Sequence, residues 1–113
     1  MITDTPTCEF DLEETVMGLI VNAGIARSLA FEALQAAKQQ KWQQAEQKMG
    51  EADTAFREAH RVQTQLIEQD EGTGQIPMTL ILVHAQDHLM TGMLLKEMVT
   101  EMIELHQKIA QLG

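Results

Sequence analysis

At 113 residues the chain is long enough for one domain with a modest buried core. Its formal net charge of −9 argues against nucleic acid or an anionic membrane as a partner, and favours partners that carry a basic surface. Its single cysteine, Cys8, excludes an internal disulfide framework, no apolar run reaches the ~20 residues that span a bilayer, and the acidic N-terminus is unlike a signal peptide, so we expect a cytoplasmic protein.

The first predicted element is a long helix over residues 10–40, preceded by a leader of residues 1–9 that we expect to be disordered. Apolar residues recur in it at steps of three and four, which is the spacing of a helical stripe. The stripe consists of Val16, Leu19, Ala23, Ala26, Ala30, Ala33 and Ala37. Because most of these residues are alanine, a neighbouring helix could approach closely.

A second helix is predicted over residues 42–69, after a short polar link at residues 39–41 that suits antiparallel neighbours. It carries one stripe at the same spacing. The stripe consists of Trp42, Ala45, Met49, Ala52, Phe56, Ala59, Gln63 and Leu66. Residues 70–77 follow with two glycines and a proline, which is the composition of a loop.

The third predicted helix covers residues 78–112 and would be about 50 Å long at ~1.5 Å per residue. It carries two neighbouring stripes. One consists of Ile81, His84, His88, Thr91, Leu95, Met98, Met102, Leu105, Ile109 and Leu112, and the other of Val83, Asp87, Met90 and Leu94. We expect this breadth to let the helix contact its own bundle on one side and another subunit on the other.

These elements predict an all-α fold, a thin antiparallel up-down-up three-helix bundle over residues 10–113 that self-associates through its third helix.

The third helix contains two histidines and a carboxylate in an otherwise apolar segment. His84, Asp87 and His88 fall on one helical face, because residues three and four apart are neighbours on a helix. Imidazole titrates near neutrality and can act as nucleophile, base or metal ligand. Burying three titratable groups is unfavourable unless they are paired or solvated, so we expect the cluster in a groove or at a subunit junction.

Three interpretations of this cluster remain open from the residues alone. The first is a purely structural coiled-coil adaptor. The second is a metal-binding helical bundle with His84 and His88 as ligands, since histidines at i and i+4 have the spacing of zinc-binding helices. The order also imitates the H-x-x-E-H pattern of one metallopeptidase class, with Asp87 in place of Glu, but no third ligand is evident.

The third interpretation is phosphoryl transfer, which needs an accessible imidazole nucleophile and a neighbour that orients it. His84 would be the nucleophile, and His88 would orient it or contact the phosphoryl oxygens. The nearest cation on this helix is Lys96. Countercharge would therefore come from a metal ion, from His88 or from a basic partner.

Five segments of the chain resemble a known family. They are residues 16–24 (VMGLIVNAG), 26–30 (ARSLA), 58–60 (EAH), 63–68 (QTQLIE) and 82–91 (LVHAQDHLMT). The chain is similar over roughly residues 12–110 to the enzyme IIA components of the lactose, cellobiose and N,N'-diacetylchitobiose branch of the bacterial phosphoenolpyruvate-dependent sugar phosphotransferase system (PTS).

The resemblance implies a cytoplasmic phosphocarrier that forms a homotrimer about its third helices. His84 matches the family's phosphorylated histidine, which takes a phosphoryl group from the carrier HPr and passes it to a cysteine of the cognate IIB component, with IIC in the membrane. Asp87 matches the carboxylate that helps to hold one Mg²⁺ per trimer near the threefold axis. No direct contact with sugar or membrane is implied, and the transported disaccharide is left open.

Two further residues receive interpretations. His60, on the polar edge of the second helix, is expected to have a surface role more readily than a place at the site. Cys8, in the leader, is not expected to be a functional thiol.

Overall fold

The computed structural model describes residues 12–113, which form three α-helices and contain no strand. The helices are α1 (Leu12–Lys38), α2 (Trp42–Asp70) and α3 (Leu80–Leu112). Each agrees with its predicted range to within two residues at the described ends. The expected leader at residues 1–9, including Cys8, lies outside the described residues.

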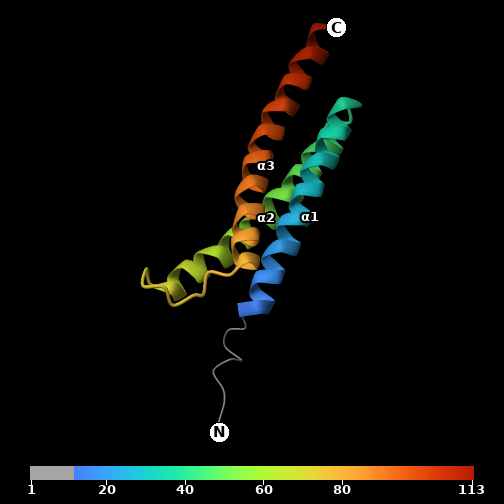
Figure 1. Ribbon diagram of the computed structural model, residues 1–113. Helices are drawn as coiled ribbons and strands as arrows, with labels where there is room; N and C mark the ends of the chain where they lie inside the picture. Colours follow the sequence, from blue (N-terminus) through green and yellow to red (C-terminus); the bar gives the residue numbers. More distant parts are fainter. Residues whose placement is uncertain (1–11) are drawn as a thin grey trace.

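The three helices run up, down and up, so that α1 and α3 point the same way (Figure 1). The bundle measures 69 × 23 × 19 Å, as elongated as expected. Helix α1 packs along both other helices, whereas α2 diverges from α3 toward the α2–α3 loop (Figure 1). Helix α3 also continues past the α1–α2 turn, so neither α1 nor α2 lies beside its last turns (Figure 1).

The two connections have the local geometry that their sequences suggest. Gln40 adopts a positive φ of 61° in the tight α1–α2 turn. Helix α2 ends at Glu71 in the left-handed region, where its N–H donates to the carbonyls of Glu68 and Ile67. Gly72 and Gly74 then take φ values of 70° and 81°, which glycine adopts without the strain that a Cβ would bring.

The predicted stripes of α1 and α2 are confirmed as core. All seven stripe residues of α1 are buried, and Ala36 joins them. In α2 six of the eight stripe residues are buried, while Trp42 and Met49 are half-buried at the edge. Because alanines line α1, the helices approach closely, and the larger side chains such as Leu19, Phe56 and Leu89 fill the space between them.

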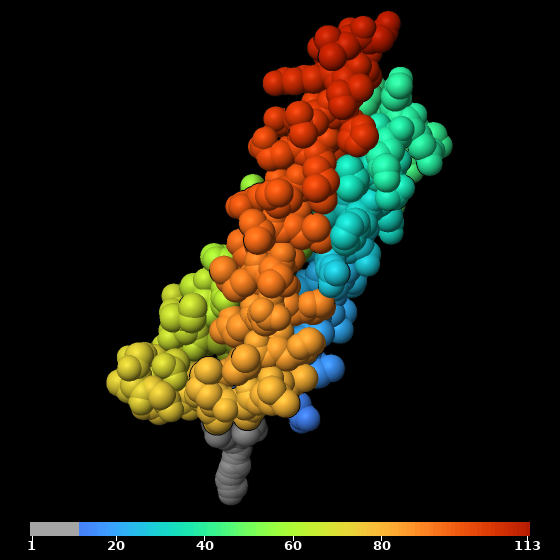
Figure 2. Space-filling view, turned by 45° about the horizontal axis from the view of Figure 1, so that its top comes forward, coloured from blue at the N-terminus to red at the C-terminus, as the bar shows by residue number. Residues whose placement is uncertain are grey.

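The prediction for α3 was wrong about which side faces the bundle. The buried residues are Leu82, Ala85, Leu89, Gly92, Val99 and Ile103, a stripe that belongs to neither predicted set. Most apolar members of both predicted stripes are exposed. We call the residues Val83, Met90, Leu94, Met98, Met102, Leu105 and Ile109 the outer face of α3. The bundle takes the side with Ala85 and Gly92 because small residues permit close packing, and the larger residues of the outer face are exposed. Figure 2 shows α3 running along the front of the molecule, where neither α1 nor α2 covers it.

By length and composition alone, α1 is long and apolar enough to cross a membrane, although polar residues such as Asn22 and Arg27 interrupt its apolar run. Its buried residues, however, pack against α2 and α3. The core helix of a bundle has this same composition, and 33% of the apolar stretch of α1 is buried inside the protein.

Candidate functional site

The histidine cluster lies in the second and third turns of α3, close to a well-defined helix start. Thr79 has an extended backbone and caps the helix, because its hydroxyl accepts a hydrogen bond of 3.2 Å from the N–H of Leu82. His84 therefore lies on a helix whose first turn is held in place, beside the α2–α3 loop end of the bundle.

The two histidine rings stack on each other. Their centroids are 5.5 Å apart and the ring planes differ by 18°. His84 is exposed, whereas His88 is half-buried. The stack limits the rotation of the His84 ring and leaves its edge open to solvent, which suits a nucleophile that must meet another protein.

Asp87 lies on the same side of α3, exposed among the apolar residues of the outer face. Its backbone carbonyl accepts a hydrogen bond of 2.8 Å from the hydroxyl of Thr91. Its carboxylate has no hydrogen bond or ion pair with any side chain of residues 12–113. Burying such an unpaired carboxylate among apolar residues would be unfavourable without a cation.

Helix α1 forms the wall behind His88. A Cβ placed on Gly24 would lie 3.9 Å from Nε2 of His88, an ordinary contact distance. The bare backbone of Gly24 therefore faces the inner histidine, which places Gly24 and His88 at the same level of the bundle. Glycine inside a helix destabilises the helix by roughly 1 kcal/mol relative to alanine. A glycine in the interior of this predicted helix is therefore a feature of the sequence that indicates a close contact at this position.

A buried amide links α2 to the same segment of α3. Gln63 is the buried polar residue of the described core, and its amide nitrogen donates to the side-chain oxygen of Gln86. The same nitrogen lies 3.7 Å from the sulfur of Met90. Gln86 precedes Asp87, so this contact orders the backbone next to the cluster. The stripe pattern marks Gln63 as a core position but carries no sign of this role.

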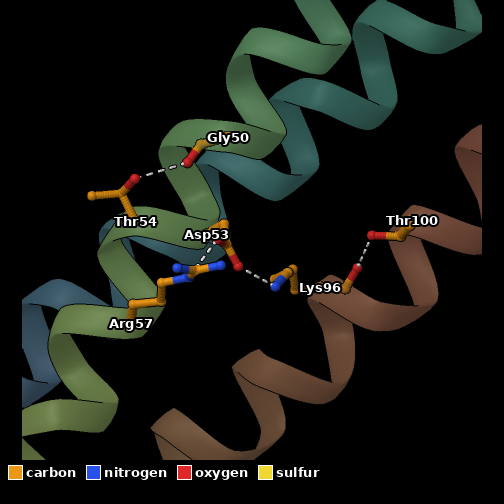
Figure 3. A network of polar contacts seen from close by, with 6 residues as sticks. All are labelled: Gly50, Asp53, Thr54, Arg57, Lys96 and Thr100. Atoms are coloured by element: carbon orange, nitrogen blue, oxygen red, sulfur yellow. Dashed lines mark hydrogen bonds and ion pairs between the residues drawn. The ribbon is translucent and has the colours of Figure 1, made fainter.

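A second polar cluster holds α2 and α3 together farther along the bundle (Figure 3). Lys96 donates to Asp53, which also pairs with Arg57 at 2.8 Å. The hydrogen bond from Lys96, assisted by both positive charges, holds the pKa of the Asp53 carboxyl below its ordinary value of 3.8. His60 lies beside this cluster in a groove with Met93 and Lys96, so the structure does not bring it to the histidine pair.

The arrangement favours a nucleophile over a chelate. Lone pairs of ring nitrogens lie in the ring planes, so two nearly parallel stacked rings do not direct their lone pairs at one point. Within residues 12–113 no three His, Cys, Asp or Glu side chains gather closely enough to hold a metal ion. What one chain offers is an exposed imidazole that is oriented by a second imidazole.

The fold and the cluster thus define an all-α three-helix protein with a stacked histidine pair near the start of its third helix. Residues 14–107 match the family described as "PTS system, Lactose/Cellobiose specific IIA subunit". Because this match spans most of the chain, the chain belongs to the lactose/cellobiose IIA family of the sugar phosphotransferase system, and it is a PTS phosphocarrier.

Individual relatives agree with this assignment. The chain is 56% identical over 108 residues to the N,N'-diacetylchitobiose-specific EIIA component of Escherichia coli K12, covering 96% of this chain and 93% of that protein. It is 41% identical over 101 residues to the lichenan-specific phosphotransferase enzyme IIA component of Bacillus subtilis, covering 89% and 92%.

Two solved structures have the same fold. The crystal structure of the cellobiose-specific enzyme IIA from Bacillus anthracis superposes with a TM-score of 0.85 at 42% identity, covering 89% of this chain and 93% of that one. The IIA(Chitobiose) of the Escherichia coli IIA–HPr complex gives a TM-score of 0.79 at 55% identity, covering 88% and 97%.

Proposed function

We propose that His84 is the residue of this phosphocarrier that receives and donates the phosphoryl group. The observation that carries the proposal is the exposed His84 ring stacked on half-buried His88. A lone pair on a neutral nitrogen of His84 attacks the phosphorus of phosphohistidine in HPr. The new N–P bond forms as the old one breaks, and the HPr imidazole keeps the bonding electron pair and takes up a proton.

In the second half of the cycle the phosphoryl group passes to the cognate IIB component. A cysteine thiolate of IIB attacks the phosphorus, so that an S–P bond forms and the N–P bond to His84 breaks. His88 keeps the His84 ring in orientation and contacts the phosphoryl oxygens in both halves. The order of carriers is thus HPr, this chain and IIB, which serves IIC in the membrane.

HPr as donor is supported by a relative. The Escherichia coli IIA of the N,N'-diacetylchitobiose branch, 55% identical to this chain, has been solved in complex with HPr. The net charge of −9 adds a physical reason, because an acidic protein attracts a carrier with a basic surface. We place the protein in the cytoplasm, serving a chitobiose- or cellobiose-type disaccharide as the named relatives do.

A homotrimer about α3 is proposed from the outer face of that helix. Leu94, Leu105 and Ile109 are each about 60% exposed in the single chain, at 58%, 59% and 61%. The face follows the helix for most of its length and continues past the α1–α2 turn, where neither α1 nor α2 lies beside α3 (Figure 1). Burying it between copies removes this apolar surface from water.

The same arrangement accounts for Asp87. In a trimer about α3, three copies of this carboxylate meet near the axis, where their mutual repulsion in an apolar seam calls for a cation. One chain offers a single carboxylate, but three copies offer the oxygen ligands that Mg²⁺ prefers. We propose one Mg²⁺ per trimer at Asp87. Its positive charge, when bound, offsets the three carboxylates and stabilises the assembly.

Intact mass after incubation with phosphoenolpyruvate, enzyme I and HPr tests the role of His84. We expect a phosphoryl adduct in the wild type and in a His60→Gln control, labile in acid and stable in base, and no adduct in His84→Gln. An adduct that persists in His84→Gln would move the nucleophile elsewhere. Absence of any adduct in the wild type would favour the alternative, a metal-binding bundle with His84 and His88 as ligands, and metal stoichiometry would then be measured.

A further inference from the structure

Apart from His88, helix α3 offers no free basic side chain close to a phosphoryl group on His84. The group carries nearly two negative charges at neutral pH, in a chain whose net charge is already −9. Asp87, on the same side of the helix, adds to the repulsion. Lys96 is the nearest cation along α3, and it is held by Asp53. Countercharge from this chain beyond that of His88 must therefore come from another helix.

Most of the eight basic residues are already paired or distant. The four in ion pairs with carboxylates are Lys48, Arg57, Arg61 and Lys96. Lys38 and Lys41 lie at the α1–α2 turn, at the opposite end of α1 from the histidine level, and Lys108 lies twenty residues beyond His88, roughly 30 Å along α3. Among the described residues, this leaves Arg27 as the cation near the site without a carboxylate partner.

The contact between Gly24 and His88 places Arg27 nearly one helical turn past the level of His88. His84 lies about 6 Å in the other direction along α3, so the Arg27 side chain has to extend back past His88 to reach a phosphoryl group on His84. Helices α1 and α3 run the same way, so Arg27 lies about 4.5 Å farther along the bundle than Gly24. Long side chains on a helix lean toward the preceding turn, which for Arg27 is the turn that contains Gly24. Because Gly24 has no side chain, the space between Arg27 and Nε2 of His88 is not filled by α1 itself.

In the structure the guanidinium of Arg27 rests elsewhere, 5.9 Å from the ring centroid of Phe31. Both side chains are exposed, and a cation–π contact at an exposed site is weak. Two parallel hydrogen bonds from a guanidinium to phosphoryl oxygens are considerably stronger. Arg27 is therefore held on Phe31 only until an anion is available within its reach.

We propose that Arg27 leaves Phe31 when His84 is phosphorylated and donates hydrogen bonds to the phosphoryl oxygens, which makes it the countercharge that this chain supplies. The inference rests on the proposed role of His84. Gly24, which has no side chain, leaves space for the guanidinium to move toward the histidines. Phe31 binds the guanidinium in the unphosphorylated protein.

The test is the equilibrium of phosphoryl exchange with HPr. HPr is charged with phosphoenolpyruvate and enzyme I, enzyme I is removed, and the ratio of phosphorylated chain to phosphorylated HPr is read by intact mass. We expect Arg27→Gln to lower this ratio about tenfold, the loss of one strong charge-assisted contact. Lys38→Gln removes the same charge from the far end of α1 and should change the ratio less than about twofold.

An equilibrium separates this role from a docking role. A residue that only contacts HPr in the complex changes forward and reverse rates alike and leaves the ratio unchanged. Arg27→Lys should give an intermediate ratio, because an ammonium group supplies the positive charge but not the two parallel hydrogen bonds of a guanidinium. Phe31→Leu removes the resting contact and should raise the ratio about two- to threefold.

The possible results separate the proposed role of Arg27 from the proposed role of His84. Equal ratios for Arg27→Gln and Lys38→Gln, with His84 phosphorylated in both, would overturn the role of Arg27 and leave that of His84 intact. A wild type that carries no phosphoryl group on His84 would overturn the proposed function itself. Helical circular dichroism equal to wild type confirms that each variant is folded before its ratio is compared.

Discussion

Gly92 of α3 lies directly against Phe56 of α2, and replacing it by alanine should destabilise the bundle. A Cβ at this position would lie 2.8 Å from Cε1 and 3.0 Å from Cζ of Phe56. Ordinary carbon–carbon contacts are about 3.5–4.0 Å, so the ring would have to move by most of an ångström. Phe56 is only 3% exposed and is packed against the core, which leaves it little room.

The size of the effect follows from two opposing contributions. Alanine stabilises a helix interior by about 1 kcal/mol over glycine, whereas overpacking a core destabilises by about 1–3 kcal/mol. Gly50 provides the matched control, because it is exposed in the interior of α2 and a Cβ added there would meet nothing within 4 Å. The replacement of glycine by alanine stabilises the helix equally in the two variants. Gly92→Ala should therefore be less stable than Gly50→Ala by about 2 kcal/mol, which is the cost of overpacking against Phe56.

Thermal unfolding followed by circular dichroism at one protein concentration measures this difference, and the fixed concentration matters if the chain self-associates. The two midpoints should differ by about 10 °C, with Gly50→Ala above the wild type. Combining Gly92→Ala with Phe56→Leu should restore part of the loss, because the two sites are in contact. Equal midpoints for the two alanine variants would refute the argument from close packing.

Three further predictions concern charge and assembly. Because Lys96 lowers the pKa of Asp53, the ionised carboxylate stabilises the fold above pH 3.8, and this stabilisation is lost as the pH falls through the pKa of the folded state. Asp53→Asn should therefore lower the free energy of unfolding by about 1 kcal/mol at pH 7, measured by urea unfolding. The difference from the wild type should vanish in acid. Leu94→Glu should give monomers in analytical ultracentrifugation, and a trimer that survives would refute assembly through the outer face. Asp87→Leu should keep the trimer in EDTA, and its dissociation there would contradict the proposed repulsion.

The buried faces of the first two helices could be predicted from the sequence because each helix has only one apolar stripe. Ala26 and Ala30 in α1, or Ala52 and Phe56 in α2, lie on the one face where apolar residues recur at helical spacing. The short link and the glycine-containing loop then allowed only antiparallel neighbours. The helix limits followed from the same local signals.

Helix α3 could not be oriented in this way because it is apolar on more than one side. Periodicity favours large residues, and so it selected Leu94 and Met98, which are exposed. The bundle instead buries the side with Ala85 and Gly92, where the small residues allow α3 to approach α1 and Phe56 closely. The preference depends on the shape of the neighbours, which no pattern within α3 contains.

Local sequence was enough to specify three helices, their order and a histidine cluster with His84 and His88 one turn apart, because these features depend on residues close together in the chain. What surrounds the cluster depends instead on tertiary packing, as the contact of Gly24 with His88 shows. The contacts between α1 and α3 join residues sixty or so positions apart. Their register is set by how closely two helices pack, which is a property of both surfaces together.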